Sequence, residues 1–168
     1  MTSNELNGKK VAVLGLSVEG LSTVKFLAKN GAIVTACDHK GGAELGNNFN
    51  DLIGMGIKDL RVGDRYLENL QQFEMVFRTP GMPLNTPQIV EAKKDGVSIS
   101  SQTKLFFDLC PCPIIGVTGT KGKGTTATLI YEILKKAGYD AYLAGNIGLP
   151  PLDFLENFHI YTLMQQAK

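Results

Sequence analysis

The feature that most constrains the fold of this chain is an alternation between short apolar runs and segments of helical periodicity. Residues 11–14, 33–37 and 75–78 are apolar runs typical of buried strands, and the first is followed by apolar residues at helical spacing up to Asn30. Weaker signals predict a helix over 43–55, a strand over 58–62, a helix over 87–95 and a strand over 97–100. This repetition predicts an α/β fold with a Rossmann-like parallel sheet covered by helices.

A break at residues 110–113 divides the chain. Pro111 and Pro113 each lack a backbone donor and disfavour helix in the residue before them. After them, a strand over 114–117, a glycine-rich loop over 118–124, a helix over 125–137 and a strand over 139–144 begin a second cycle. We therefore expect a Rossmann-like domain over 1–110 and, over 111–168, the truncated start of a P-loop-type α/β ATPase domain. The second is too short to be stable alone, because roughly 60 residues bury only a marginal core.

Composition excludes several classes of function. Lys and Arg number 17 and Asp and Glu 16, and the resulting net charge of +1 argues against broad binding to nucleic acid or to a membrane surface. No apolar run in the sequence approaches the length of a membrane span, and residues 1–10 do not resemble a secretory signal. Three cysteines without a regular framework suit free thiols in a reducing compartment, so we expect a cytoplasmic protein.

The strongest functional signal is the segment 116–126, GVTGTKGKGTT. Its glycines allow a tight turn that points backbone N–H groups at an anion, and the helix that follows favours phosphate at its N-terminus. Lys123 would neutralise phosphate charge, and a hydroxyl of Thr125 or Thr126 could bind Mg²⁺. The spacing is shorter than the G-x-x-x-x-G-K-[ST] pattern, and the alternative is a flexible surface turn. We predict an ATP site formed by Gly119, Thr120, Lys121, Gly122, Lys123, Gly124, Thr125 and Thr126.

A second glycine-rich turn, GLSVEG over 15–20, follows the first strand and opens a helix. It resembles the dinucleotide pattern G-x-G-x-x-G, but Ser17 replaces the middle glycine that lets the backbone approach a pyrophosphate. This weakens an NAD or FAD interpretation. The turn could be the tight first turn of any doubly wound sheet, or it could bind a nucleoside diphosphate placed differently from NAD. Asp38, at the end of the next strand, could accept hydrogen bonds from hydroxyl or imide groups of such a ligand.

Two further loops follow predicted strands, at the edge where parallel sheets bind ligands. Residues 79–83 (TPGMP) follow the strand over 75–78, and residues 145–148 (GNIG) follow the strand over 139–144. Each loop could line a nucleotide site or be an ordinary turn. Asn146 is accordingly either a hydrogen-bonding residue or a turn residue with positive φ.

Together, residues 15–20, Thr79-Pro80-Gly81, the loop 119–123 and residues 145–148 resemble the Mur ligases of peptidoglycan synthesis. The similarity covers nearly the whole chain, which corresponds to the family's N-terminal UDP-binding domain and the start of its central ATPase domain. Folylpolyglutamate synthase has a similar phosphate loop but typically begins with the ATPase domain, so the preceding 1–110 unit favours a Mur ligase. Within the family, the similarity is greatest to the members that add D-glutamate to UDP-N-acetylmuramoyl-L-alanine.

The resemblance implies an ATP-dependent carboxylate–amine ligase that forms an amide through an acyl phosphate. Its cofactors would be ATP and Mg²⁺, and its substrates UDP-N-acetylmuramoyl-L-alanine and D-glutamate. It also implies that Lys123 is the catalytic residue that stabilises the transferring phosphoryl group and that Thr125 meets the metal. We expect a monomer without nucleic-acid or membrane partners. The implied residues of the UDP-substrate site are Val18, Glu19, Gly20, Asp38, His39, Lys40, Gly81 and Asn146.

The chain departs from the family pattern in its phosphate loop and in its extent. Lys121 stands where the family usually has Asn, and Gly124 separates the lysine from Thr125 and Thr126, so either threonine is a candidate for the metal. The family's downstream Glu, His and carbamylated Lys and its C-terminal domain have no counterpart up to Lys168, so we expect a truncated fragment that is inactive by itself. The alternatives are a non-catalytic module for UDP or NAD(P), another Mur or folylpolyglutamate-type ligase, and a redox enzyme that uses residues 15–20.

Overall fold

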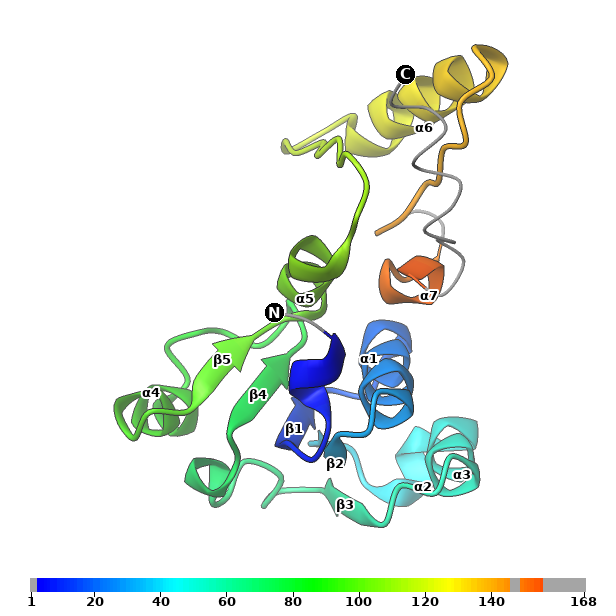
Figure 1. The fold of residues 1–168 in the computed structure, drawn as a ribbon. Helices are drawn as coiled ribbons and strands as arrows, with labels where there is room; N and C mark the ends of the chain where they lie inside the picture. The colour runs from blue at the N-terminus through cyan, green and yellow to red at the C-terminus, as the bar shows by residue number, and fades with distance from the viewer. Residues whose placement is uncertain (1–2, 146–148, 156–168) are drawn as a thin grey trace. The chain divides into compact units, whose positions relative to one another are not determined.

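The computed structural model describes residues 3–145 and 149–155 and divides the chain into two compact units, Met1–Leu109 and Cys110–Lys168. The first unit contains a five-stranded parallel sheet in the order β3-β2-β1-β4-β5 (Figure 1). Its strands are β1 (Lys10–Leu14), β2 (Ile33–Asp38), β3 (Asp59–Val62), β4 (Met75–Arg78) and β5 (Ser98–Ser100). This confirms the Rossmann-like parallel sheet that the sequence predicted.

The strand order reverses between β1 and β4. The chain runs outward from β1 through β2 to β3 and then crosses back to place β4 on the other side of β1. In open α/β sheets, this reversal opens a crevice outside the carboxyl ends of the strands, and ligands bind there. The topology therefore points to the loops that follow β1, β2 and β4.

The core lies on both faces of the sheet, because side chains alternate along each strand. Ala12, Leu14 and Val76 face one layer, which also contains residues of the 3-10 helix η2 (Leu70–Gln72) and of α4 (Pro87–Lys94). Val11 and Val13 therefore face the opposite side, and α1 (Val18–Lys29) contacts both β1 and β2. Burial on two faces explains why β1 reads as a continuous apolar run rather than an alternating one.

The helices of the first unit differ from the predictions in two places. The single helix expected over 43–55 is two helices, α2 (Gly42–Leu45) and α3 (Asn47–Gly54), because Gly46 between them adopts a φ of 54° that no helix contains. A helix that the sequence analysis missed, α5 (Gln102–Leu109), ends the first unit and contacts α1. A short 3-10 helix, η1 (Ser3–Leu6), precedes β1.

The second unit contains α6 (Lys123–Lys136), which matches the predicted helix, and the short α7 (Leu152–Leu155). The strands expected over 114–117 and 139–144 do not form. The described part of this unit has only one isolated parallel bridge, between Ala144 and Leu149. A strand needs a neighbour to complete its hydrogen bonds, and residues 114–117 have no partner among the described residues. Ile115 is accordingly 61% exposed.

Candidate functional site

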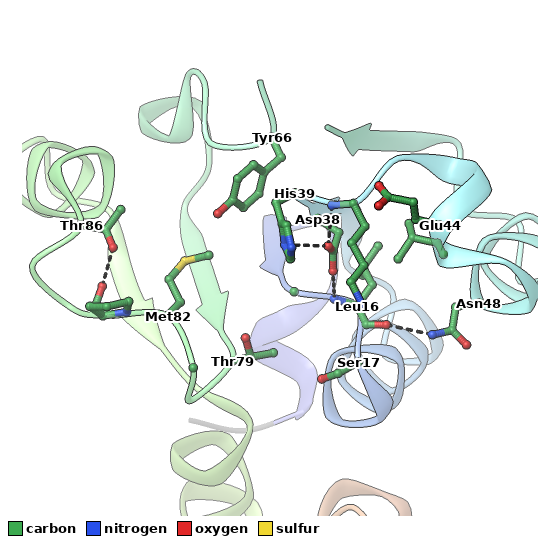
Figure 2. Close-up of a pocket in the computed structure, with 15 residues that line it drawn as sticks. Leu16, Ser17, Asp38, His39, Glu44, Asn48, Tyr66, Thr79, Met82 and Thr86 are labelled. Atoms are coloured by element: carbon green, nitrogen blue, oxygen red, sulfur yellow. Dashed lines mark hydrogen bonds and ion pairs between the residues drawn. The ribbon is translucent and has the colours of Figure 1, made fainter. Parts of the chain in front are cut away.

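A pocket of about 460 Å³ lies in the first unit at the carboxyl edge of its sheet, and Figure 2 shows its side chains. Three loops line it: the turn after β1, the loop after β2 and the loop after β4. These are the loops at the reversal of strand order, so the pocket lies where the topology predicts a ligand.

Two glycines of the first turn are required by its geometry. Gly15 has a φ of 93°, and a Cβ there would lie 2.5 Å from the hydroxyl oxygen of Thr79. A Cβ at Gly20 would lie 1.8 Å from the Gly15 carbonyl oxygen, which is far inside van der Waals contact. The first and last glycines of the GLSVEG pattern therefore let the turn pass close to β4 and let α1 pack against the turn. Ser17, between them, is the N-cap residue of α1 but makes no capping hydrogen bond, and it lines the pocket.

Asp38 holds the turn after β1 and the loop after β2 together. The residue is only 5% exposed, and its Oδ2 accepts a hydrogen bond of 2.6 Å from the Leu16 amide. Its Oδ1 accepts one of 2.9 Å from the Lys40 amide and lies 3.1 Å from Nδ1 of His39. Asn48 of α3 adds a further tie by donating to the Leu16 carbonyl at 3.1 Å. Asp38 thus positions the turn and leaves little of its own carboxylate for a ligand.

The loop after β4 is braced by Arg78. Its Nη1 donates to the carbonyl of Met82 at 2.8 Å and to that of Thr79 at 3.3 Å, so the guanidinium closes the loop across its base. A backbone bond of 3.1 Å from the Met82 amide to the Thr79 carbonyl completes this turn. Gly81 and Met82 are thereby held at the wall of the pocket.

The structure brings together only part of the predicted UDP-substrate site. Asp38, His39, Lys40 and Gly81 line the pocket. Val18 is 71% exposed and does not line it. Glu19 and Gly20 line a separate cavity of about 10 Å³, about the room of one water molecule. Asn146 lies outside the described residues. Its role and those of the other members of this site stay predictions.

No sequence motif predicted several of the residues that line the pocket. Tyr66 lies in the loop after β3, Glu44 and Asn48 lie on α2 and α3, and Thr86 precedes α4. No motif surrounds them, and only the fold brings them to the edge of the sheet. Tyr66 follows the strand predicted over 58–62, but only the pairing of β3 with β2 places it beside the pocket. Burial, with Asp38 and Cys37 nearby, raises the pKa of the Tyr66 phenol.

The predicted phosphate loop belongs to the second unit. Gly119 and Gly122 adopt φ values of 145° and 77°, and α6 begins directly after Gly122. The Lys123 ammonium donates to the Gly119 carbonyl across the loop, and the first intrahelical bond runs from the Thr126 amide to the Gly122 carbonyl. The loop therefore has the glycine turn, lysine and helix start that the sequence predicted, without the strand before them.

Neither a metal cluster nor a membrane span is found in the part of the chain that the structure describes. Within it, no three His, Cys, Asp or Glu side chains come close enough to share a metal ion. Likewise, no described helix combines the length and the apolar character needed to span a bilayer.

A parallel sheet with this strand order and a pocket at the reversal of that order defines a Rossmann-like α/β domain with a candidate nucleotide site. A family model described as "Mur ligase MurD-like, N-terminal domain" matches residues 9–101. The chain belongs to the Mur ligase family.

Two curated relatives and one solved structure show the extent of the similarity. The UDP-N-acetylmuramoylalanine--D-glutamate ligase of Acetivibrio thermocellus is 43% identical over 152 residues, which cover 90% of this chain and 32% of the relative. That of Clostridium botulinum is 44% identical over 142 residues, which cover 84% and 31%. A pseudomurein peptide ligase type C from Methanothermus fervidus shares the fold, with a TM-score of 0.50, 24% identity, and coverage of 78% of this chain and 27% of that one. The chain spans about a third of the length of the curated relatives it matches.

Proposed function

We propose that the first unit binds the UDP part of UDP-N-acetylmuramoyl-L-alanine and that the chain is the N-terminal part of an ATP-dependent ligase that adds D-glutamate to it. The observation that carries the proposal is the pocket at the reversal of strand order, which is lined by the glycine turn and the Asp38 loop. The relatives support it, because proteins that bear the name of that ligase match most of this chain in sequence.

In this proposal the turn after β1, which ends at Ser17, the N-cap residue of α1, binds the diphosphate. The first amides of a helix have no intrahelical partner, and the helix dipole favours negative charge beside them. Asp38 fixes the direction of the turn through the Leu16 amide, and Ser17 offers a hydroxyl at the same place. Lys40 is a cationic residue of the pocket lining and would offset part of the diphosphate charge.

The loop of the second unit fits the charge of a triphosphate. Its Lys123 ammonium and the amides at the start of α6 are donors of the kind that anions require. Mg²⁺ would be held by a hydroxyl of Thr125 or Thr126 together with phosphate oxygens, since both threonines follow the lysine in the first turn of α6.

The chemistry in this proposal is amide formation. Bound ATP would supply the phosphoryl group that activates the substrate carboxylate, leaving ADP, and attack by the amine of D-glutamate would form the amide and release inorganic phosphate and a proton. Lys123 would stabilise the charge that develops on the transferring group.

The proposal for the first unit is tested by measuring ligand-induced stabilisation of the 168-residue chain. We expect UDP to stabilise it and NAD⁺ to leave it unchanged. At a UDP concentration 100 times the Kd, the free energy of unfolding should rise by about 2.7 kcal/mol. Stabilisation by NAD⁺ and not by UDP would instead support a redox or NAD(P)-binding module.

The proposal for the second unit is tested by Lys123→Ala. We expect the variant to lose any stabilisation by Mg·ATP and to keep the stabilisation by UDP, because Lys123 belongs to the second unit and the pocket to the first. Lys136→Ala, at the far end of α6, removes an equal charge and serves as the control. Loss of both ligand effects in the Lys123 variant would contradict the assignment of two sites.

A further inference from the structure

One pocket residue, Tyr66, has no role in the nucleotide site as described so far. Its loop follows β3, and its side chain packs against the core cluster that contains Leu14, Cys37 and Phe73. The back of the ring is therefore fixed, while the residue also lines the pocket. Figure 2 shows the ring beside His39, with Met82 nearby on the loop after β4.

Tyr66 and His39 contact each other through tilted rings. The centroids of Tyr66 and His39 are 6.2 Å apart, and the ring planes are inclined by 57°. This is a tilted contact rather than a face-to-face stack, so His39 does not cover the phenol ring. His39 is itself oriented, since its Nδ1 lies 3.1 Å from Asp38, while its side chain is 70% exposed. Both rings are thus held in place before any ligand binds, which lowers the entropic cost of binding.

These groups follow one another in a fixed order along the pocket. The turn amide of Leu16 binds one oxygen of Asp38, the other oxygen lies beside His39, and His39 lies beside Tyr66. The order is therefore turn, carboxylate, imidazole and phenol. A nucleoside diphosphate whose phosphates lie at the turn would extend its ribose past Asp38 and place its base at the rings.

We propose that Tyr66 is a nucleotide-binding residue on which the uracil ring stacks, with His39 at the edge of the base. This inference rests on the proposed function, because it assumes UDP in this pocket. It adds a binding residue from outside the glycine and aspartate motifs, and it makes the phenol ring, rather than a hydrogen bond to its hydroxyl, the source of affinity.

The test compares two substitutions of Tyr66 in the full chain by titration calorimetry with UDP and with inorganic pyrophosphate. Tyr66→Leu keeps an apolar side chain against the core but removes the π face, and we expect it to weaken UDP binding by about tenfold or more. Tyr66→Phe keeps the face and should bind UDP as the unchanged chain does. Neither substitution should alter pyrophosphate binding. Phe107→Leu on α5, an exposed ring that does not line the pocket, is the matched control.

The outcomes separate the inference from the proposed function. If the unchanged chain binds UDP and Tyr66→Leu binds it equally well, the stacking is refuted and the proposed function stands. If Tyr66→Leu weakens UDP and pyrophosphate alike, Tyr66 only supports the pocket, and the inference is again refuted. If the unchanged chain does not bind UDP, the proposed function fails first. Upfield shifts of the uracil H5 and H6 resonances with the unchanged chain and Tyr66→Phe, but not with Tyr66→Leu, would support stacking directly.

Discussion

At the scale of single residues, Gly20 shows how tightly the turn after β1 is built. We expect Gly20→Ala to lower the free energy of unfolding by about 1–3 kcal/mol, because its Cβ would meet the Gly15 carbonyl and force backbone to move. Gly54→Ala in α3 is the matched control, since a Cβ there meets nothing within 4 Å. It should stabilise the protein by about 0.5–1 kcal/mol through helix propensity. Urea denaturation of both variants measures the difference, and equal effects would contradict this account of the turn.

Cys37 gives a prediction about pH. Burial raises the pKa of its thiol from 9.0 to about 12, with nearby Asp59 and Asp38 adding to the rise and Arg61 opposing it. The folded state therefore holds this proton more tightly than the unfolded state. The resulting stability is fully present below about pH 9 and is lost between about pH 9 and pH 12, by roughly 1.4 kcal/mol per pH unit.

The comparison of Cys37→Ala with the unchanged chain isolates this effect, because other groups titrate in the same range. The variant should lose stability less steeply above pH 9, whereas Cys110→Ala should keep the steeper slope. At pH 8 a thiol reagent should modify the partly exposed Cys110 and Cys112 in the folded protein and reach Cys37 only after unfolding. Rapid modification of all three thiols in the folded protein would contradict the burial of Cys37.

At the scale of elements, α5 is tied to α1 by one buried side chain. Gln102 is 6% exposed, and its Nε2 donates to the Glu19 carbonyl at 2.9 Å and to the Thr23 hydroxyl at 3.2 Å. We expect Gln102→Leu to cost about 1 kcal/mol, because two hydrogen bonds are lost while the Thr23 hydroxyl still donates to the Glu19 carbonyl. Gln72→Leu removes the exposed bond to the Asn69 carbonyl and should cost almost nothing. Thermal unfolding of the two variants tests this, and equal losses would mean that Gln102 does not hold the two helices together.

The same scale shows how far the sequence could predict the fold. The five strands of the first unit are predictable because each is an apolar run or lies between turn signals, and the structure forms a strand in all five places. Helix α5, with the sequence QTKLFFDL, was missed because its eight residues directly adjoin the proline break, although its apolar residues recur at helical spacing. The strands over 114–117 and 139–144 carry apolar residues but do not form, since apolar character indicates a buried strand only where neighbours can bury it.

The residues of the pocket also divide into those that could be predicted from the sequence and those that only the fold reveals. Asp38 and Gly81 were predictable from the pattern, because Asp38 ends a predicted strand and Gly81 lies in the loop after another; His39 and Lys40 were expected from the family resemblance. Tyr66 follows a strand as well, but its loop carries no recurring pattern, and only the order of β3 beside β2 places it at the pocket. A motif locates the residues of its own turn, whereas residues that reach a pocket through topology require the fold.

At the scale of the whole molecule, the two units differ in how their apolar residues are buried. The first has a sheet with a core on both faces, whereas α6, all of whose residues are described, contains no buried residue. Leu129 and Ile133 of α6 are 57% and 65% exposed. Helices of about 12–15 residues are marginal in water without tertiary packing. The stability of this chain should therefore come from the first unit.

We accordingly expect a chain that ends at Leu109 to unfold cooperatively and to bind UDP as the 168-residue chain does, because every described residue that lines the pocket lies before that point. Residues 110–168 alone should show little helix by circular dichroism and no cooperative transition in urea. Titration calorimetry with UDP on the shortened chain completes the test. A shortened chain that folds but has lost UDP affinity would show that residues after Leu109 contribute to the site. A cooperative transition of 110–168 by itself would show that the second unit has a core of its own.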